Sequence, residues 1–476
     1  MRLQLTGARD TRRVMAAASL ALGVLAHGEV AAAATKAART QEEAEAKKEA
    51  EAKKETSGKK TAGRKKAVVK PEVIFLEEDS GAASEHEPGA QGASGQATES
   101  DGAAAPAKAG APGPTWRVSL ETTAYTDTDA VNVLSPVLAA GASDEVVGWS
   151  VGGSYLVDVV TAASVDIVST ASPSWTELRH VGALNGSAKW DPVTLGAVAV
   201  VSREPDYLAI TGGGSLSIDL MEKNVTPYIA SSFEKDSVGV TGLPHEYWWD
   251  KRVTSVQVGV TLVLGRTTIG SVQWDSSFER GYLAKPYRYV PLFAPGQAAS
   301  IPVGASIDEV NRRRVSLRPI ERLPGRRDRH AFSAHLAHRL GQATLRFDER
   351  LYADDWRLLA ATTELRYFLD IGKRLQLWPH LRHHLQGSVS FWKRAYEALP
   401  GSSGLVAPAL RTGDRELGPL QTIVLGAGAR WIITQDATSH WDLLFEVDVG
   451  RTTFSDTLYI QERRMGYTTL ALEAVF

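Results

Sequence analysis

Apolar and polar residues alternate over long stretches in the second half of this 476-residue chain. The clearest stretches are 255–264, 374–385 and 440–449, in which most alternate residues are Val, Leu, Trp or Phe. A period of two predicts β-strands with one apolar and one polar face. Strands of soluble sandwiches usually run about 5–6 residues, whereas a tilted strand needs about 9–11 residues to cross a bilayer. The length of these stretches therefore favours strands that span a membrane.

The chain ends on an aromatic residue that is in register with such an alternation. In the segment Tyr467–Phe476, one face of the predicted strand carries Phe476, Ala474, Leu472, Leu470 and Thr468. This ending resembles the closing strand of bacterial outer-membrane β-barrels, in which the terminal aromatic residue belongs to the signal read by the barrel-assembly machinery. The resemblance implies that Phe476, Leu472 and Leu470 form an assembly signal. A buried edge strand of a soluble sandwich would show the same pattern, so the rest of the chain has to decide.

The beginning of the chain predicts export. Arg12 and Arg13 precede a short apolar run, and small residues follow it, with a cleavage site best placed after Ala34. The apolar run is shorter than the roughly 20 residues that a membrane-spanning helix needs, so residues 1–34 are predicted to be a signal peptide. The chain contains no cysteine, which excludes lipid attachment through cysteine, disulfides and thiolate metal sites.

The composition narrows the class of protein further. The net charge is −2, which argues against a nucleic-acid partner, because such a partner requires a basic domain. No long apolar run predicts a transmembrane helix. Strands of a barrel escape that test, since their lipid-facing and lumen-facing residues alternate and the hydropathy averages out.

Residues 35–115 have the composition of a disordered linker. The first part is rich in Ala, Lys and Glu, and from Pro71 onward the linker is acidic and rich in Gly, Ser and Pro. Neither part can bury enough apolar surface to offset the entropy of ordering. The exception is the apolar island 73–76, which is either a docking peptide for a periplasmic partner or a passing apolar cluster. We therefore expect a disordered periplasmic extension ahead of the barrel.

From residue 116 to residue 476, the alternation predicts an all-β fold, a transmembrane antiparallel up-and-down β-barrel of about 16 strands (range 14–18). The strands are predicted near 116–125, 147–158, 162–169, 178–189, 192–203, 208–221, 225–236, 253–264, 267–280, 329–340, 343–353, 356–369, 373–388, 418–433, 440–453 and 463–476. The tight connections then follow even-numbered strands. The long segments 126–146, 237–252, 281–328 and 389–417 follow odd-numbered strands. Outer-membrane barrels have this asymmetry, with short periplasmic turns and longer outer loops.

Several motifs resemble those of a known family. They are YTDTDAVNVLSP at 125–136, the segment 153–173, SREPDY at 202–207 and the segment 329–356 that ends in YADDW. The chain is similar here to an uncharacterised bacterial family that carries a domain-of-unknown-function name and is regarded as a family of outer-membrane β-barrels. The resemblance covers essentially all of 116–476. It implies the fold and the compartment, and it supplies no substrate, cofactor or catalytic residue.

The inward faces of the predicted strands carry many charges. Together with His335, Asp348 and Glu364, one predicted wall carries the basic residues Arg339, Arg346, Arg350, Arg366, Arg374, His380, Arg382 and His384. Neighbouring strands turn inward the acidic residues Asp275, Glu279, Asp442, Glu446 and Asp448. A basic wall that faces acidic groups would orient and filter charged solutes. The alternative is that these ions pair across strands and only stiffen a solvated wall.

The same residues do not predict a metal or catalytic centre. His380 and His384 share a strand face, but four residues of strand separate them by about 13 Å, too far to bind one ion together. Asp127 and Asp129 lack the remaining positions of a calcium loop and are expected to be solvated. No nucleophile elbow of the GxSxG type occurs. We therefore predict no enzyme, no cofactor and no metal.

The segment 281–328 is the most distinctive predicted outer loop, and its end is rich in arginine. It would either fold inward as a constriction or plug, or stay outside near anionic lipopolysaccharide, where a basic loop is expected anyway. The chain as a whole predicts a porin-like channel, or the outer-membrane component of an export system, for polar or anionic solutes. The alternative is a barrel that docks a periplasmic machine through residues 35–115. Expected partners are outer-membrane lipids and lipopolysaccharide, the barrel-assembly machinery and a periplasmic partner of residues 35–115.

Overall fold

The computed structural model describes residues 113–162, 175–402, 404–436 and 439–476. The predicted signal peptide and nearly all of the predicted linker lie outside these residues. The predicted strand 162–169 also lies outside them, apart from Ala162. Among the helices that the structure describes, none is long and apolar enough to cross a membrane.

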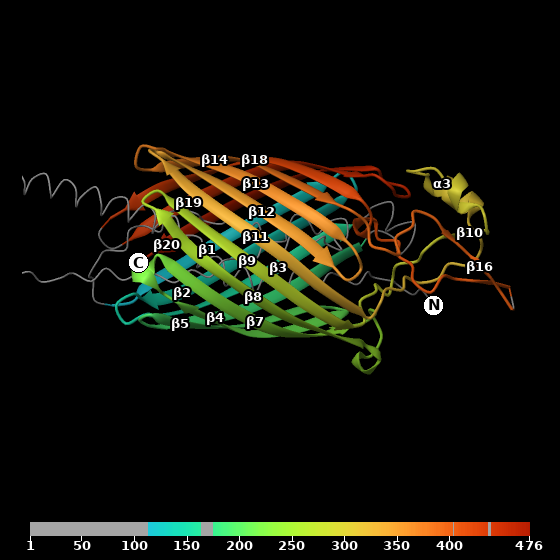
Figure 1. Ribbon diagram of the computed structural model, residues 1–476, viewed down its shortest axis with the longest axis horizontal. Helices are drawn as coiled ribbons and strands as arrows, with labels where there is room; N and C mark the ends of the chain where they lie inside the picture. Colours follow the sequence, from blue (N-terminus) through green and yellow to red (C-terminus); the bar gives the residue numbers. More distant parts are fainter. Residues whose placement is uncertain (1–112, 163–174, 403, 437–438) are drawn as a thin grey trace, which may run out of the picture.

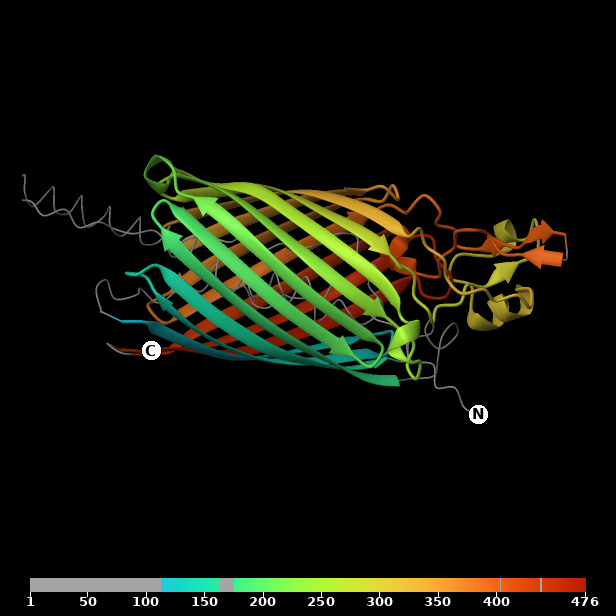
Figure 2. The ribbon, with the colours of Figure 1, turned by 90° about the horizontal axis from the view of Figure 1, so that it is seen from below.

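Sixteen of the described strands form one closed antiparallel barrel, in which each strand pairs with its neighbour in this set and the last strand pairs with the first (Figures 1 and 2). Its sixteen strands are β1 (Thr115–Asp127), β2 (Val131–Asp144), β3 (Trp149–Ala162), β4 (Trp175–Trp190), β5 (Val193–Glu204), β6 (Tyr207–Ile218), β7 (Val225–Val238), β8 (Trp249–Gly265), β9 (Thr268–Gly281), β11 (Arg326–Leu340), β12 (Ala343–Asp354), β13 (Leu359–Ile371), β14 (Leu375–Gln386), β18 (Leu420–Gln435), β19 (His440–Phe454) and β20 (Glu462–Val475). The predicted fold and strand number are therefore confirmed.

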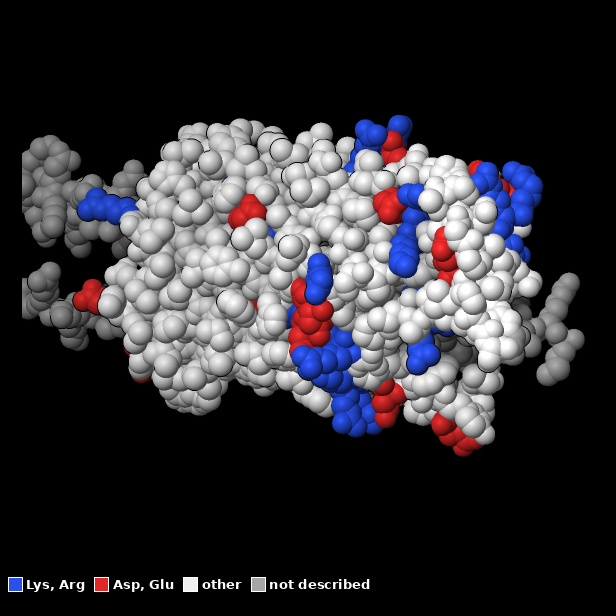
Figure 3. All heavy atoms as spheres, turned by 45° about the vertical axis from the view of Figure 1, so that its right-hand side comes forward, with Lys and Arg blue, Asp and Glu red and all other residues white. Residues whose placement is uncertain are grey.

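The alternation of residue types decides which side chains face the interior of the barrel, the lumen. On β19, Asp442 and Asp448 are at most 3% exposed, whereas Phe445 and Val449 on the other face are 45% and 60% exposed. In Figure 3, charged side chains gather toward the end of the barrel that carries the long loops, and uncharged residues form most of the remaining wall. An apolar outer face and a polar inner face are what a barrel in a lipid bilayer requires.

One predicted loop is wrong. The segment 126–146 contains the strand β2, which pairs with β1 along its whole length. Pro136 and the small residues that follow it hide the alternation, because proline cannot donate to the ladder and usually marks an edge or a break. The structure accommodates the proline, since neither Ser135 nor Pro136 has a ladder partner on β3. In the barrel, β3 pairs directly with β4, so the sixteen described strands include the missed strand β2.

The connections at the two ends of the barrel differ in length. At one end they are tight turns such as 191–192, 266–267 and 341–342, whereas the two longest, 282–325 and 387–419, leave the other end. The shorter connections include two single-turn 3-10 segments, η1 (Met221–Lys223) and η2 (His245–Tyr247). When β2 is counted, both of these long connections follow odd-numbered strands of the barrel, as predicted.

The described residues of 282–325 and 387–419 together form a structure that we call the outer cap. Its elements are β10 (Leu292–Phe293), η3 (Ala298–Ser300), α3 (Ile307–Arg313), β15 (Tyr396–Glu397), β16 (Leu399–Gly401), β17 (Gly404–Val406) and η4 (Arg415–Leu417). The strands β10 and β15 pair in parallel and join the two connections. Figure 1 shows α3, β10 and β16 beyond the end of the barrel.

The outer cap has an apolar core of its own. Leu292, Phe293 and Ile301 are at most 1% exposed and pack in clusters that include Tyr396. The helix α3 begins at Ser306, whose side chain accepts a hydrogen bond from the Glu309 backbone N–H. Most of the predicted loop 281–328 therefore forms a folded structure outside the barrel.

Candidate functional site: the charged lumen wall

The predicted basic residues lie where the alternation placed them, with one exception. Their strands β11–β14 are consecutive in the barrel, and we call their inward-facing charged side chains the basic arc. The inward positions of these strands carry Arg339, Arg346, Arg350, Arg366, His380, Arg382 and His384. The prediction that Arg374 faces the lumen is wrong. Arg374 lies in the turn 372–374, which precedes β14, and its side chain is exposed.

Most of the basic arc is paired with carboxylates on its own strands. Arg346 Nε lies 2.8 Å from Asp348 Oδ2, and the other oxygen of that carboxylate lies 2.5 Å from His335 Nδ1. Two further pairs are Arg339 with Asp370 at 2.6 Å and Arg366 with Glu364 at 2.5 Å. Pairing of this kind stiffens the wall and leaves a smaller net positive charge on it.

The predicted acidic residues lie beside the basic arc. Asp275 and Glu279 are on β9, next to β11. Asp275 forms an ion pair with Arg350 at 2.9 Å, and Glu279 forms one with Arg329 at 2.6 Å. On β19, Asp442 pairs with Arg430 and lies 2.8 Å from His440. These carboxylates compensate neighbouring cations, so they do not form the opposing wall.

The inner wall also carries carboxylates that the sequence reasoning did not select. We call this set the acidic arc; it lies on β3–β7 and contains Asp158, Glu177, Glu204, Asp206, Glu234 and Asp236, each at most 6% exposed. Arg179 pairs with Asp158 at 2.8 Å, and Lys251 with Asp236 at 3.3 Å. In the strand order, β8 and β9 separate the two arcs on one side and five strands separate them on the other. The two arcs therefore lie in different sectors of the barrel wall, with the acidic arc near the end that carries the long loops and Arg339 and Arg346 toward the opposite end.

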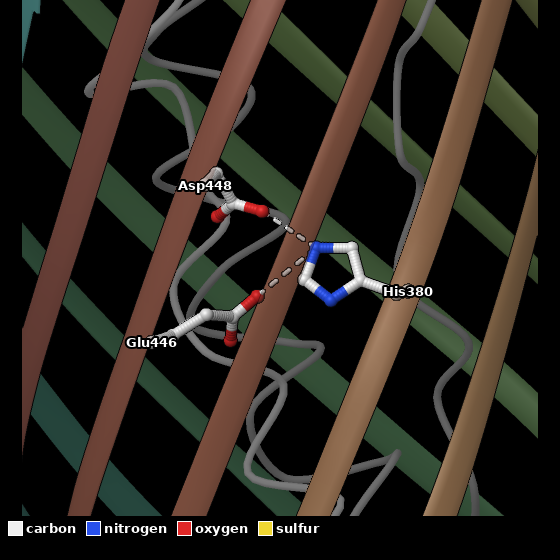
Figure 4. Close-up of side chains that lie close together, drawn as sticks. All are labelled: His380, Glu446 and Asp448. Carbon is white, nitrogen blue, oxygen red and sulfur yellow. Dashed lines mark hydrogen bonds and ion pairs between the residues drawn. The ribbon is translucent and has the colours of Figure 1, made fainter.

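A histidine and two carboxylates meet on the inner wall, and we call them the histidine–carboxylate cluster (Figure 4). His380 Nε2 lies 2.6 Å from Asp448 Oδ1 and 3.6 Å from Glu446 Oε1. His380 is on β14 and the carboxylates are on β19, with β18 between them. The inward residues of β18 at this level are Gly426 and Gly428, and no side chain there blocks the approach. No spacing in the sequence indicates this meeting, because His380 and the two carboxylates lie on strands that β18 separates.

A second group of potential metal ligands is Glu177, Glu204 and Asp206 in the acidic arc, whose oxygens lie within 4.8 Å of one another. Arg179 Nε lies 4.0 Å from Glu204. This group contains no nitrogen ligand. Oxygen-only sets suit hard cations rather than transition metals.

The outer cap is fastened to the mouth of the barrel. The Tyr287 hydroxyl donates to Asp206 at 2.5 Å, Arg288 lies 2.5 Å from Asp414, and Arg415 lies 2.5 Å from Asp129. These contacts run from the β5–β6 turn, through both long connections, to the β1–β2 turn. Burial, together with the charge of Asp206, raises the pKa of Tyr287. The hydroxyl therefore stays protonated and continues to donate.

The predicted assembly signal lies on the outer face at the seam of the barrel. Leu470 and Phe476 are 50% and 51% exposed, and Leu472 is 36% exposed. The backbone of Phe476 exchanges hydrogen bonds of 2.9 and 3.1 Å with Trp116. The last residue therefore takes part in closing the barrel and leaves its ring accessible.

Comparison with known proteins finds no curated protein that matches this sequence. Among solved structures, the chain is similar to the CymD monoaromatic hydrocarbon channel (TM-score 0.34, 9% identity, 76% of this chain and 87% of that chain). It is also similar to the outer membrane protein opdK from Pseudomonas aeruginosa (TM-score 0.37, 6% identity, 76% and 99%) and to a bacterial polysaccharide outer membrane secretin (TM-score 0.39, 10% identity, 76% and 97%). At these TM-scores the similarity carries no argument about function.

A family model gives a more extensive match. It covers residues 14–436, which include β1 to β18 and the whole outer cap. The chain therefore belongs to the family described as "Protein of unknown function (DUF3570)".

Proposed function

We propose that the protein is an outer-membrane channel for polar solutes, with a preference for anions. The observation that carries the proposal is the segregation of lumen charges inside a closed barrel, with basic side chains on β11–β14 and acidic side chains on β3–β7. Charges of opposite sign on different sectors of the wall create a transverse field that orients a dipolar or charged solute as it passes. The acidic arc is almost fully buried, whereas the side chains of Arg339 and Arg346 keep 22% and 11% exposure. On this side a solute meets arginines together with their partner carboxylates, since Asp370 and Asp348 are 30% and 16% exposed.

The outer face supports a membrane location. Exposed leucines, valines and aromatic residues cover the outward sides of the strands, as a bilayer requires. Near the long loops the outer face carries exposed arginines, among them Arg326, Arg451 and Arg464 with side chains 62–74% exposed. We propose that these arginines contact the anionic headgroups of lipopolysaccharide, because cationic side chains close to an anionic surface attract it within a Debye length.

The channel is tested by recording the full-length protein in planar bilayers under a KCl gradient, where the reversal potential gives the ratio of anion to cation permeability. We expect stable conductance with anion preference. Arg346→Gln and Arg382→Gln each remove one lumen charge and should lower that ratio by roughly a factor of two or more.

The matched control is Arg451→Gln, which removes the same charge from the outer face, where Arg451 pairs with Glu462 at 2.6 Å. Its permeability ratio should equal that of the unmodified protein. Absence of conductance in well-folded protein would contradict the channel. If the protein conducts but neither lumen variant changes the permeability ratio, the basic arc does not determine the selectivity.

A further inference from the structure

We propose that His380, Glu446 and Asp448 form a binding site for a divalent first-row transition-metal ion, with Zn²⁺ preferred. The site would lie on the inner wall of the barrel, and the proposal does not depend on the channel function. It rests on four observations: the ligand distances, the space provided by glycines, a buried carboxylate oxygen, and the chemistry of the three donors.

The three donor atoms lie within 4.8 Å of one another, and the two distances from His380 are close to those that a zinc ion needs. Zn–N and Zn–O bonds near 2.0–2.2 Å hold two tetrahedral ligands about 3.3 Å apart. His380 Nε2 lies 3.6 Å from Glu446 Oε1 and 2.6 Å from Asp448 Oδ1. The first distance has to shorten slightly and the second has to open by less than an ångström. Side-chain rotations supply both changes without moving a strand.

Two glycines make the space in which the donors meet. Strands β14 and β19 lie on either side of β18, so their backbones are roughly 9–10 Å apart. A Cβ on Gly426 would lie 1.9 Å from Asp448 Oδ1 and 2.4 Å from His380 Nε2. The space beside Gly428 is filled in the same way, because the Trp378 ring lies 2.0 Å from the position that a Cβ on Gly428 would take. Side chains from two non-adjacent strands therefore share one pocket over β18.

Glu446 is held as a metal-binding carboxylate would be. Its Oε2 accepts a hydrogen bond of 3.3 Å from Trp378 Nε1. Its Oε1 is buried, has no hydrogen-bond partner among the described residues, and points toward His380 (Figure 4). Carboxylate ligands are commonly oriented by such a second hydrogen bond, which leaves the other oxygen for the ion.

The donor set selects the class of ion. One imidazole nitrogen and two carboxylate oxygens suit Zn²⁺ and its neighbours, whereas Mg²⁺ and Ca²⁺ prefer oxygen ligands alone. A neutral imidazole and two carboxylates give two negative charges, which a divalent cation balances. The adjacent cation Arg366, which pairs with Glu364 at 2.5 Å, also acts on Glu446 and offsets part of this negative charge. The competing interpretation is a metal-free ion pair between a protonated His380 and the two carboxylates.

Isothermal titration of the full-length, chelator-treated barrel with Zn²⁺ separates the two interpretations. The proposal expects one saturable site per chain for Zn²⁺ and none for Mg²⁺ at the same concentration. His380→Gln, Glu446→Gln and Asp448→Asn should each weaken Zn²⁺ binding by about tenfold or more. Gly426→Ala keeps all three ligand residues, but its Cβ would fill the space in which His380 and Asp448 meet, so it should also abolish the site.

The chain offers a matched control in His440, which lies 2.8 Å from Asp442 on the same strand β19. Among the described residues its ion pair is with that one carboxylate, which also pairs with Arg430. His440→Gln should leave the Zn²⁺ affinity unchanged. Circular dichroism and heat-dependent gel mobility establish that each variant is folded. Absence of a saturable Zn²⁺ site, or binding that His380→Gln does not weaken while His440→Gln does, would overturn the proposal.

Discussion

Phe476 takes part in two different contacts at the seam of the barrel. Its backbone pairs with Trp116 on β1, and its ring packs edge-on against Trp441, with 5.8 Å between the ring centroids. The ring is still half exposed. The exposed ring is open to a protein that binds the seam from outside, as the predicted assembly signal requires.

Phe476→Ala should therefore reduce assembly into the outer membrane more than it reduces stability. The lost ring contact is worth about 0.5–1.5 kcal/mol, which a barrel of this size tolerates. We expect a several-fold lower yield of heat-modifiable barrel in cells and near-normal refolding in detergent. Phe445→Ala, on the outer face of β19 with 45% exposure, is the matched control. Equal losses for both variants would mean that Phe476 is only a packing residue.

The directions of single side chains were largely predictable, because a strand has only two faces. Arg346, Arg350 and Arg382 face inward, as the alternation indicated. The prediction for Arg374 was wrong because β14 begins at the next residue. The meeting of His380 with Asp448 was not predictable in this way. It depends on which residue the intervening strand places between them, and a glycine carries no sign of the side chains that will cross it.

At the scale of elements, β2 shows the limit of the alternation. Its residues include Pro136 and a run of small residues, so the strand is held by its ladder with β1 and by contacts such as Ser135 Oγ with Asp158 at 2.5 Å. Such tertiary support is invisible in a local pattern. The outer cap was missed for the same reason, since β10 and β15 are two residues long and come from different connections.

One buried carboxylate links the two connections of the outer cap. Glu321 accepts from Thr412 at 2.6 Å and lies 3.5 Å from Arg288. Burial raises the pKa of Glu321 above its ordinary value, and the positive charge of Arg288 only partly counteracts this. A carboxyl group whose pKa is raised by folding contributes most stability while it is protonated. The outer cap should therefore be most stable below the ordinary pKa of glutamate and should weaken as the pH rises through the raised pKa of Glu321.

Hydrogen exchange of amides in 285–323, corrected for the intrinsic effect of pH, measures this dependence. Protection should fall as the pH rises, and Glu321→Gln, which is neutral at every pH, should flatten the curve. Glu309→Gln is the control, because Glu309 on α3 makes only a surface pair with Arg313 at 3.0 Å. If Glu321→Gln leaves the pH dependence of protection unchanged, another group causes that dependence.

At the scale of the whole molecule, the barrel and the outer cap have separate stabilising interactions. The barrel is closed by its ladder from β1 to β20, and the outer cap has its own apolar clusters. The two are joined at the mouth by buried polar contacts, such as Arg415 with Asp129, and by shared apolar clusters. In one cluster Tyr287 packs against Val181 and Tyr207 of the barrel, and in another Leu417 packs against Tyr352. The outer cap can therefore restrict entry to the lumen without being needed to close the barrel.

Replacing residues 282–325 by a short turn should therefore leave a folded barrel with a higher single-channel conductance, because the part of the outer cap that is fastened over the mouth by Tyr287 and Arg288 is then gone. The selectivity should remain anionic, since the basic arc lies on β11–β14 and is untouched.

The control is to replace 399–406, the β16–β17 hairpin, by two glycines. The residues of β16 and β17 are all exposed, so their loss removes a smaller outer element without touching the mouth, and the conductance should not change. If removal of 282–325 leaves the conductance as it was, the outer cap stands clear of the solute path, and access to the two arcs is set by the barrel wall alone.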